Sequence, residues 1–337
     1  MYDEHAGHLS IDFHSGISRI AYFKRQVNVI AFFSLLLIVF AFGAAYVRPI
    51  AEAFFLRMLN GDHVLLLSMM DIWDMFTYVC HFFLPLLVVL LSYRDPGFRP
   101  YIPFRPHLPA HSLSVIFASV GILFVFGILN SAFFSFVEKF GLVVPVISVE
   151  FPQTPLRLVL YFISAVILPP FVEELIYRGF VMHLLLPYGK TFAILGSAVL
   201  FGLMHLSLST FLYATVAGVL LGYFVVKSGS VWIGIFIHLS NNLLSFLIQT
   251  AECLFSDPFS AILVSVIRCT TVFLGLIGCL ILCLHSMKKE DRITFESGSH
   301  YNRVLDNRSV LRASMTLPMI VYLICGCYYM MINTFLI

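Results

Sequence analysis

The sequence carries very little charge for its length. Only 11% of its 337 residues are Asp, Glu, Lys or Arg, whereas 60% are hydrophobic and the mean hydropathy is +0.95. Ordinary soluble domains have about 25% charged residues, so this chain cannot provide the polar surface that two soluble domains of the same total length would need. The composition predicts an all-α polytopic membrane protein built as one helical bundle. The small net charge of +2 gives no reason to expect a nucleic-acid partner.

Cysteine pairs suited to zinc binding or disulfide exchange are also missing. Neither C-x-x-C nor the zinc signature H-E-x-x-H occurs. The N-terminus opens with about 25 polar and mixed residues, so we expect the first apolar run to be a retained span rather than a cleaved signal peptide. The seven cysteines stand almost entirely inside apolar runs, which indicates packing. They are Cys80, Cys253, Cys269, Cys279, Cys283, Cys325 and Cys327.

Long apolar runs, by contrast, recur along the chain. A helix needs about 20 residues to cross some 30 Å of hydrocarbon, and runs of this length predict about nine transmembrane helices. Eight is the alternative, because the fifth run is short and the sixth follows almost at once. The predicted spans are 27–47, 72–93, 112–136, 158–187, 191–206, 209–227, 231–250, 260–284 and 314–337.

The runs divide the chain into four parts. We expect a cytoplasmic tail over 1–26, three transmembrane helices within 27–157 and a core over 158–250. The last part, 251–337, holds C-terminal transmembrane helices and a polar stretch at 285–313, either a cytoplasmic loop or a surface helix.

Basic residues indicate the orientation of the chain. With a cytoplasmic N-terminus, most Lys and Arg fall in inside segments, as the positive-inside rule requires. The inside set is Arg19, Lys24, Arg25, Arg94, Arg99, Arg105, Lys190, Lys227, Lys288, Lys289, Arg292, Arg303, Arg308 and Arg312, against Arg48, Arg57, Lys139 and Arg157 outside.

Two smaller patterns predict structural roles. Gly218 and Gly222 form a G-x-x-x-G motif, which provides a close-packing face for another helix. Asp71 and Asp74 flank Trp73 at the expected start of the second span, where the helix dipole favours carboxylates. A part in admitting substrate is the alternative for these two acids.

One apolar run is interrupted by two carboxylates and a guanidinium. It reads Pro169-Pro170-Phe-Val-Glu173-Glu174-Leu-Ile-Tyr-Arg178-Gly. Each ionised residue near the centre of a transmembrane helix costs about 2.5–3.5 kcal/mol, so these residues are a functional-site hypothesis by default. Residues four apart share a helix face, which pairs Glu174 with Arg178 and leaves Glu173 without a cation. An unpaired buried carboxylate suits a general base.

Polar residues also interrupt two later spans. Phe201 is followed at i+4 by His205, and His238 is followed at i+4 by Asn242. Imidazole and amide groups are able to donate hydrogen bonds to a developing oxyanion, so with the acids they could converge on a water molecule and hydrolyse an amide bond. The alternative is that they only tie helices together, through hydrogen bonds worth about 0.6 kcal/mol each.

The ordered set Glu173-Glu174-x-x-x-Arg178, Phe201-x-x-x-His205 and His238-x-x-x-Asn242 resembles the CAAX-protease and bacteriocin-processing family of intramembrane proteases, also called the Abi family. The resemblance spans residues of about 158–250. It implies that Glu173 activates the attacking water with help from His205. It further implies that His238 and Asn242 line the oxyanion hole, with Glu174, Arg178 and Phe201 in support.

A catalytic zinc is the mechanistic alternative. Glu173, His205 and His238 would make three protein ligands and leave the fourth position for water. The resemblance favours a glutamate-dependent mechanism without a cofactor, and we expect no metal.

The sequence predicts only the chemical class of the substrate. We expect a membrane-associated peptide or lipidated protein, cleaved by a bacterial plasma-membrane enzyme in contact with the lipid bilayer. One rival hypothesis is a non-catalytic protein of the same fold, acting in bacteriocin immunity or peptide binding. A transporter is a third hypothesis, since broken helices also mark transport sites, but the chain shows no second half with a matching interruption.

Overall fold

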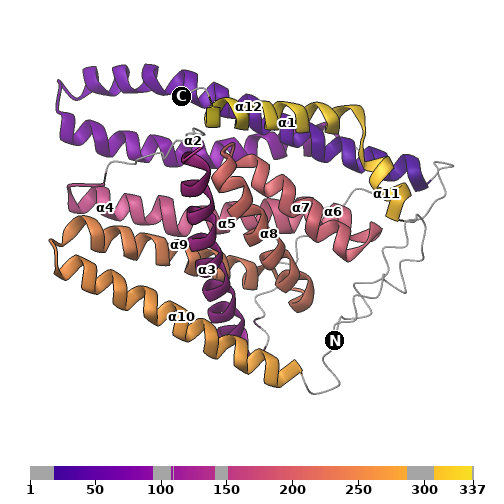
Figure 1. Cartoon of the computed structure of the whole chain (residues 1–337). Helices are drawn as coiled ribbons and strands as arrows, with labels where there is room; N and C mark the ends of the chain where they lie inside the picture. The colour runs from indigo at the N-terminus through magenta and orange to yellow at the C-terminus, as the bar shows by residue number, and fades with distance from the viewer. Residues whose placement is uncertain (1–18, 94–107, 109, 141–150, 287–306, 336–337) are drawn as a thin grey trace.

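A computed structural model describes residues 19–93, 108, 110–140, 151–286 and 307–335. Within these ranges the regular elements are all helices, as predicted (Figure 1). They are α1 (Arg19–Met58), α2 (His63–Ser92), α3 (Ser112–Glu138), a continuous helical rod from α4 (Pro155–Phe162) to Tyr188, α7 (Lys190–Met204), α8 (Leu208–Ser228), α9 (Val231–Leu254), α10 (Phe259–Ser286), α11 (Asn307–Ser314) and α12 (Leu317–Phe335).

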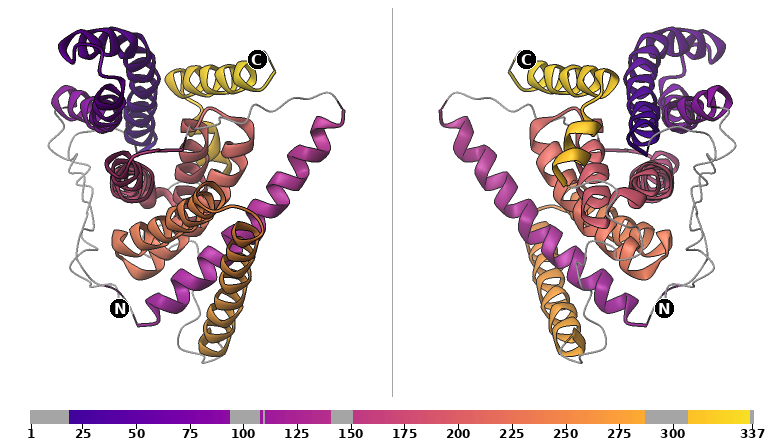
Figure 2. Two further views of the ribbon diagram at one scale, coloured as in Figure 1. Left: turned by 90° about the vertical axis from the view of Figure 1, so that its left-hand side faces the viewer. Right: turned by 90° about the vertical axis from the view of Figure 1, so that its right-hand side faces the viewer.

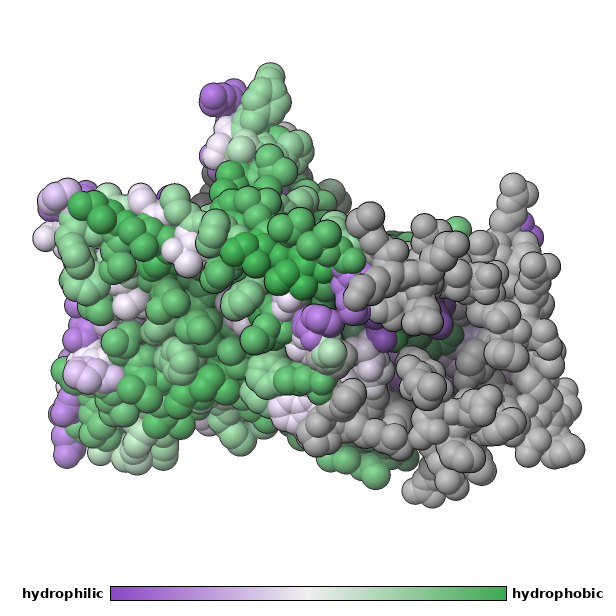
Figure 3. Space-filling view, turned by 90° about the horizontal axis from the view of Figure 1, so that it is seen from below, coloured by the Kyte–Doolittle hydropathy of each residue, from purple (hydrophilic) through white to green (hydrophobic). Residues whose placement is uncertain are grey.

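The polytopic bundle is confirmed. Each predicted span overlaps a described helix, and seven of the described helices are long and apolar enough to cross a membrane. The helices Lys190–Met204 and Leu317–Ile332 are apolar but shorter, so the count of nine crossings stays a prediction. Hydrophobic residues cover most of the described surface in Figure 3, and hydrophilic residues gather along its left edge and beside the grey segment. Such a surface suits contact with lipid.

The ends of the first two spans differ from the prediction. The first helix continues past the apolar run to Met58, and the second begins at His63, where the Asp62 carboxylate accepts hydrogen bonds from the amides of Val64 and Leu65. The helix continues through Pro49, and the residues beyond it include good helix formers such as Ala51 and Glu52.

Asp71 and Asp74 therefore lie inside α2 and not at its start. Arg157 on α4 donates to Asp71 at 2.8 Å, and Arg48 on α1 donates to Asp74 at 3.1 Å. Their structural role is to join α2 to two neighbouring helices.

The predicted parts of the sequence are not separate in space. α1 packs beside α2 and α12, whereas α3 packs against α8, α9 and α10. In both views of Figure 2, α3 runs obliquely across the bundle while α4 is seen nearly end-on. Of the predicted tail 1–26, residues 1–18 lie outside the described residues and 19–26 form the start of α1. Residues 287–306 also lie outside the described residues, and α11 is a helix that overlaps the end of the predicted polar stretch 285–313.

Glycines allow two close helix crossings. A Cβ built on Gly218 of α8 would lie 2.9 Å from the Cα of Ala198 on α7, which confirms the close-packing face predicted for the G-x-x-x-G motif. On α3 and α10, a Cβ on Gly275 would lie 2.8 Å from the Cα of Gly121. Helices without large side chains at the crossing gain van der Waals contact between their backbones.

Gly275→Ala should therefore destabilise the protein, by about 1–3 kcal/mol, because the new methyl group meets backbone that cannot move aside. Gly43→Ala in α1 is the matched control, since a Cβ there has nothing within 4 Å. The control should be neutral or stabilising by up to about 1 kcal/mol, the helix preference for alanine. Thermal unfolding in detergent measures both, and equal melting temperatures would contradict the close α3–α10 contact.

Candidate active site

Glu173 and Glu174, the acid pair, lie on a helical rod that changes from α-helical to π-helical winding twice. The rod begins at α4, where Thr154 caps the first turn and Pro155 occupies the first helical position. It continues through a π-helical turn (Ile163–Ile167), α5 (Leu168–Glu174) and a second π-helical segment (Leu175–Val181). π-helical turns occur frequently at functional sites. The pair Glu173-Glu174 thus ends the short α-helical piece between two π segments.

The two prolines explain the first change of winding. Pro169 has no amide hydrogen, so the carbonyl of Ala165 lacks its usual donor four residues on. The side-chain amide of Asn242 on α9 donates to this carbonyl at 3.0 Å. Asn242 is predicted to line an oxyanion hole. One of its two amide hydrogens is instead donated to the carbonyl that Pro169 leaves without a helical donor.

Glu174 and Arg178 form the ion pair that their spacing predicts. Nη1 of Arg178 lies 2.9 Å from Oε1 of Glu174, and the two residues are 1% and 0% exposed. Nη2 of Arg178 donates to the carbonyl of Gly218 at 3.2 Å, and its guanidinium carbon lies 4.6 Å above the ring of Phe201. One guanidinium thus joins the rod to α7 and α8.

Glu173 is buried beside a hydroxyl and an imidazole. The hydroxyl of Tyr78 on α2 donates to Oε1 of Glu173 at 2.6 Å. Nε2 of His238 on α9 lies 3.9 Å from Oε2 of the same carboxylate. Glu173 is 6% exposed. Its two oxygens therefore face different neighbours, and the second is too far from the imidazole for a direct hydrogen bond.

His238 lies between the two carboxylates. Its Nδ1 is 3.2 Å from Oε1 of Glu174, the oxygen that Arg178 also contacts. A carboxylate held by an arginine accepts hydrogen bonds, so Nδ1 of His238 carries a proton and donates it to Glu174, while Nε2 faces Glu173. The proton on Nδ1 is assigned from its acceptor. The arrangement gives His238 an orienting carboxylate on one side and a potential reaction partner on the other.

His205 lies at the end of α7, on the other side of Phe201. Its Nδ1 is 2.9 Å from the carbonyl of Phe201, and its ring centroid is 5.1 Å from that of Phe201. The ring of His238 is 6.1 Å from the same phenylalanine. Among the described residues, no hydrogen bond or ion pair joins His205 to Glu173. The two histidines therefore converge on Phe201, but only His238 reaches the acid pair directly.

The alternative zinc ligands are not brought together as a set. Throughout the described part of the chain, no three His, Cys, Asp or Glu side chains are grouped so that they could hold a metal ion. Glu173, His205 and His238 are therefore not arranged as three ligands of one ion in this conformation.

Two contacts at the site had no signal in the sequence. Tyr78 is 95 residues from Glu173 along the chain, and it stands in an apolar run with no motif. Gly234 on α9 leaves room for the acid pair, because a Cβ there would lie 2.9 Å from Oε2 of Glu174. Only the packing of α2 and α9 against the rod reveals these contacts.

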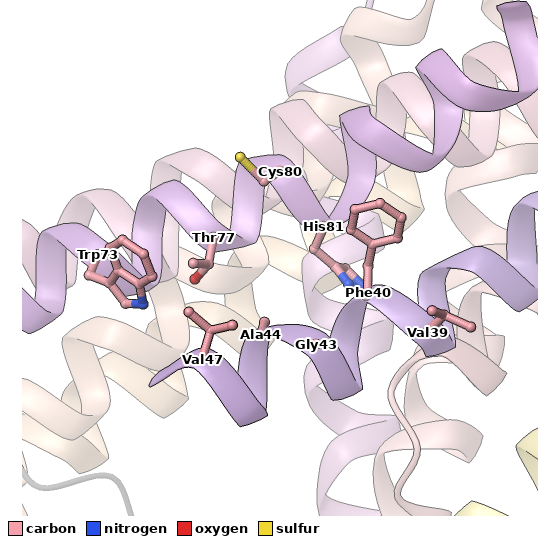
Figure 4. A pocket seen from close by; sticks show the side chains of 9 residues that line it. All are labelled: Val39, Phe40, Gly43, Ala44, Val47, Trp73, Thr77, Cys80 and His81. Atoms are coloured by element: carbon pink, nitrogen blue, oxygen red, sulfur yellow. The ribbon is translucent and has the colours of Figure 1, made fainter. Parts of the chain in front are cut away.

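A separate apolar cavity of about 330 Å³ lies between α1 and α2. Figure 4 shows Trp73, Thr77 and His81 facing it from α2, and Phe40 and Val47 from α1. Neither acid of the pair lines it, so this cavity is not the site of the acid–imidazole cluster.

Comparison with known proteins bears on the segment that carries these residues. Residues 155–244 match the family model described as Rce1-like, type II CAAX prenyl endopeptidase Rce1-like. The match confirms the predicted resemblance and supports an intramembrane protease, and the long apolar helices make the chain an integral multi-pass membrane protein. No match was found among curated proteins, nor among solved structures.

Proposed function

We propose that this chain, whose residues 155–244 carry the Rce1-like domain, hydrolyses a peptide bond of a membrane-associated peptide or lipidated protein. The position of Glu173 carries the proposal. It is a buried carboxylate inside the matched segment, with a hydroxyl on one oxygen and an imidazole facing the other. This geometry suits a general base that works on water.

In the proposed reaction Glu173 activates the attacking water. The water oxygen attacks the carbonyl carbon of the peptide bond, and Glu173 accepts a proton from the water. The same carboxyl group then donates that proton to the leaving nitrogen as the C–N bond breaks, which yields a carboxylic acid and an amine. The 3.9 Å between Oε2 of Glu173 and Nε2 of His238 suits a water molecule hydrogen-bonded to both.

The remaining polar groups stabilise the transition state in this proposal. Asn242 keeps a second amide hydrogen, besides the one on Ala165, that is available to an oxyanion. The family resemblance gives His205 the role of helping Glu173 with the water, whereas the contacts favour His238 for that role. His205→Gln and His238→Gln separate the two assignments, because the residue that handles the water should give the larger loss of turnover.

No cofactor takes part in the proposed mechanism, because the carboxylate itself accepts the proton. Turnover should therefore survive exhaustive chelation of divalent ions. Loss of turnover on chelation, restored by zinc alone, would contradict this part of the proposal and revive a metal-dependent reaction.

The proposal is tested with the full chain in liposomes. Fluorogenic peptides are tethered to the same membranes by a prenyl or an acyl chain, with an untethered peptide for comparison, and mass spectrometry locates the cut. We expect the wild type to cleave a tethered peptide and Glu173→Ala to leave it intact. Equal cleavage by both proteins, or none by either across the panel, would overturn the protease proposal.

For localisation we propose a bacterial plasma membrane with the N-terminus in the cytoplasm. The distribution of Lys and Arg along the sequence supports this orientation. Reporter fusions at the N-terminus and after α10 would test it, since both should report the cytoplasmic side.

A further inference from the structure

We propose that Tyr78 is a positioning residue for Glu173, so that the first helices of the chain complete the active site. The inference rests on the proposed function. Tyr78 lies on α2, outside the segment 155–244 that matches the protease family. Its hydroxyl nevertheless makes the shortest polar contact of Glu173, at 2.6 Å from Oε1.

The contact restricts an otherwise mobile side chain. A glutamate has three rotatable bonds, and a base at the wrong angle cannot accept a proton from bound water. A hydrogen bond from a hydroxyl to a carboxylate is among the stronger ones in proteins. With Oε1 held by Tyr78, the second oxygen of Glu173 is left to face Nε2 of His238.

Tyr78 is itself held in place. Its ring packs against Phe82, one turn further along α2, with ring centroids 5.2 Å apart, and Phe82 is 1% exposed. A side chain fixed on its carbon side and hydrogen-bonded at its tip has little freedom to leave the carboxylate. Tyr78 therefore meets the geometric requirement of a positioning group.

The register of α2 against the rod is also fixed. Asp71 precedes Tyr78 by seven residues, which is two turns, so both side chains lie on nearly the same face of α2. Asp71 accepts two hydrogen bonds from Arg157 of α4, at 2.8 and 3.3 Å. This face of α2 thus contacts the rod at two points, one at Arg157 near the start of the rod and one at Glu173.

The test compares two Tyr→Phe variants in the liposome assay. Tyr78→Phe should lower kcat by about 10- to 100-fold, the range expected for losing a hydrogen bond to a charged group, and leave KM nearly unchanged. Tyr213→Phe is the matched control, because its hydroxyl also makes a 2.6 Å hydrogen bond, to Oδ1 of Asn241. The control should keep the wild-type kcat.

Further measurements separate positioning from folding. Tyr78→Phe should melt close to Tyr213→Phe, and it should cause no additional loss of turnover when Glu173 is already glutamine. A double-mutant cycle on melting, with Tyr78→Phe and Glu173→Ala, measures the coupling of the two side chains without any cleavage assay, because alanine removes the acceptor altogether.

The outcomes distinguish the two proposals. If the wild type cleaves, Glu173→Ala does not, and Tyr78→Phe keeps full kcat, the positioning role is overturned and the protease proposal stands. A change of KM alone would also overturn it, in favour of substrate binding. If no protein cleaves, the protease proposal fails. The positioning role then falls with it, and the melting cycle still reports whether the contact exists.

Discussion

Glu173→Gln should reduce the cleavage rate by about 10²- to 10⁴-fold, the usual contribution of general acid–base catalysis. Glutamine has nearly the shape of glutamate, and its carbonyl oxygen still accepts a hydrogen bond from Tyr78. It lacks the ability to take a proton from water. The variant should therefore fold and bind peptide as the wild type does, and lose turnover only.

The measurement is single-turnover cleavage of a membrane-tethered peptide in liposomes, with melting temperature as the check on folding. Glu252→Gln is the matched control, because Glu252 lies in an exposed pair with Arg268 at 3.4 Å. Its turnover should equal that of the wild type. A Glu173→Gln enzyme within a few-fold of the wild type would mean that another group activates the water.

Arg178→Met should have the largest effect on stability, a loss of about 3–5 kcal/mol in the free energy of unfolding. The substitution leaves Glu174, which is 0% exposed, without its cation. It also removes the donor to the carbonyl of Gly218 and the guanidinium above Phe201. A charge left unpaired in a buried site costs far more than the pair itself contributes.

Thermal unfolding in detergent measures this loss, and two further variants test its cause. Arg268→Met removes the guanidinium of an exposed pair and should cost no more than about 1 kcal/mol. Glu174→Gln added to Arg178→Met should restore much of the stability, because the buried charge that Arg178 balanced is then removed as well. Equal melting of Arg178→Met and Arg268→Met would contradict the buried network.

Local features of the site could be predicted from the sequence. The pairing of Glu174 with Arg178 depends only on helix geometry, and the structure has it at 2.9 Å. The apolar runs likewise predict the helices, because about 20 residues must lie in hydrocarbon. The end of α1 could not be predicted this way, because hydropathy falls at Arg48 while the helix continues to Met58.

Contacts between distant segments could not be predicted. Counted along the predicted spans, His205 lies about fourteen residues into 191–206 and His238 about seven residues into 231–250. At 1.5 Å per helical residue, these positions differ in membrane depth by roughly 10 Å. In the structure α7 ends at Met204 and both imidazoles reach Phe201. The contact of Tyr78 with Glu173 is harder still to predict, since nothing in an apolar helix indicates which tyrosine will contact a carboxylate on another helix. Such contacts depend on how the helices pack.

Pro169 has a consequence for Asn242, because it leaves one carbonyl of the rod without its helical hydrogen-bond donor. In an unbroken α-helix the carbonyl of Ala165 would accept a hydrogen bond from the amide hydrogen of residue 169. Because proline has none, the amide of Asn242 is the donor that the carbonyl receives. The contact of Asn242 with the rod thus follows from a hydrogen atom that is missing from the rod itself.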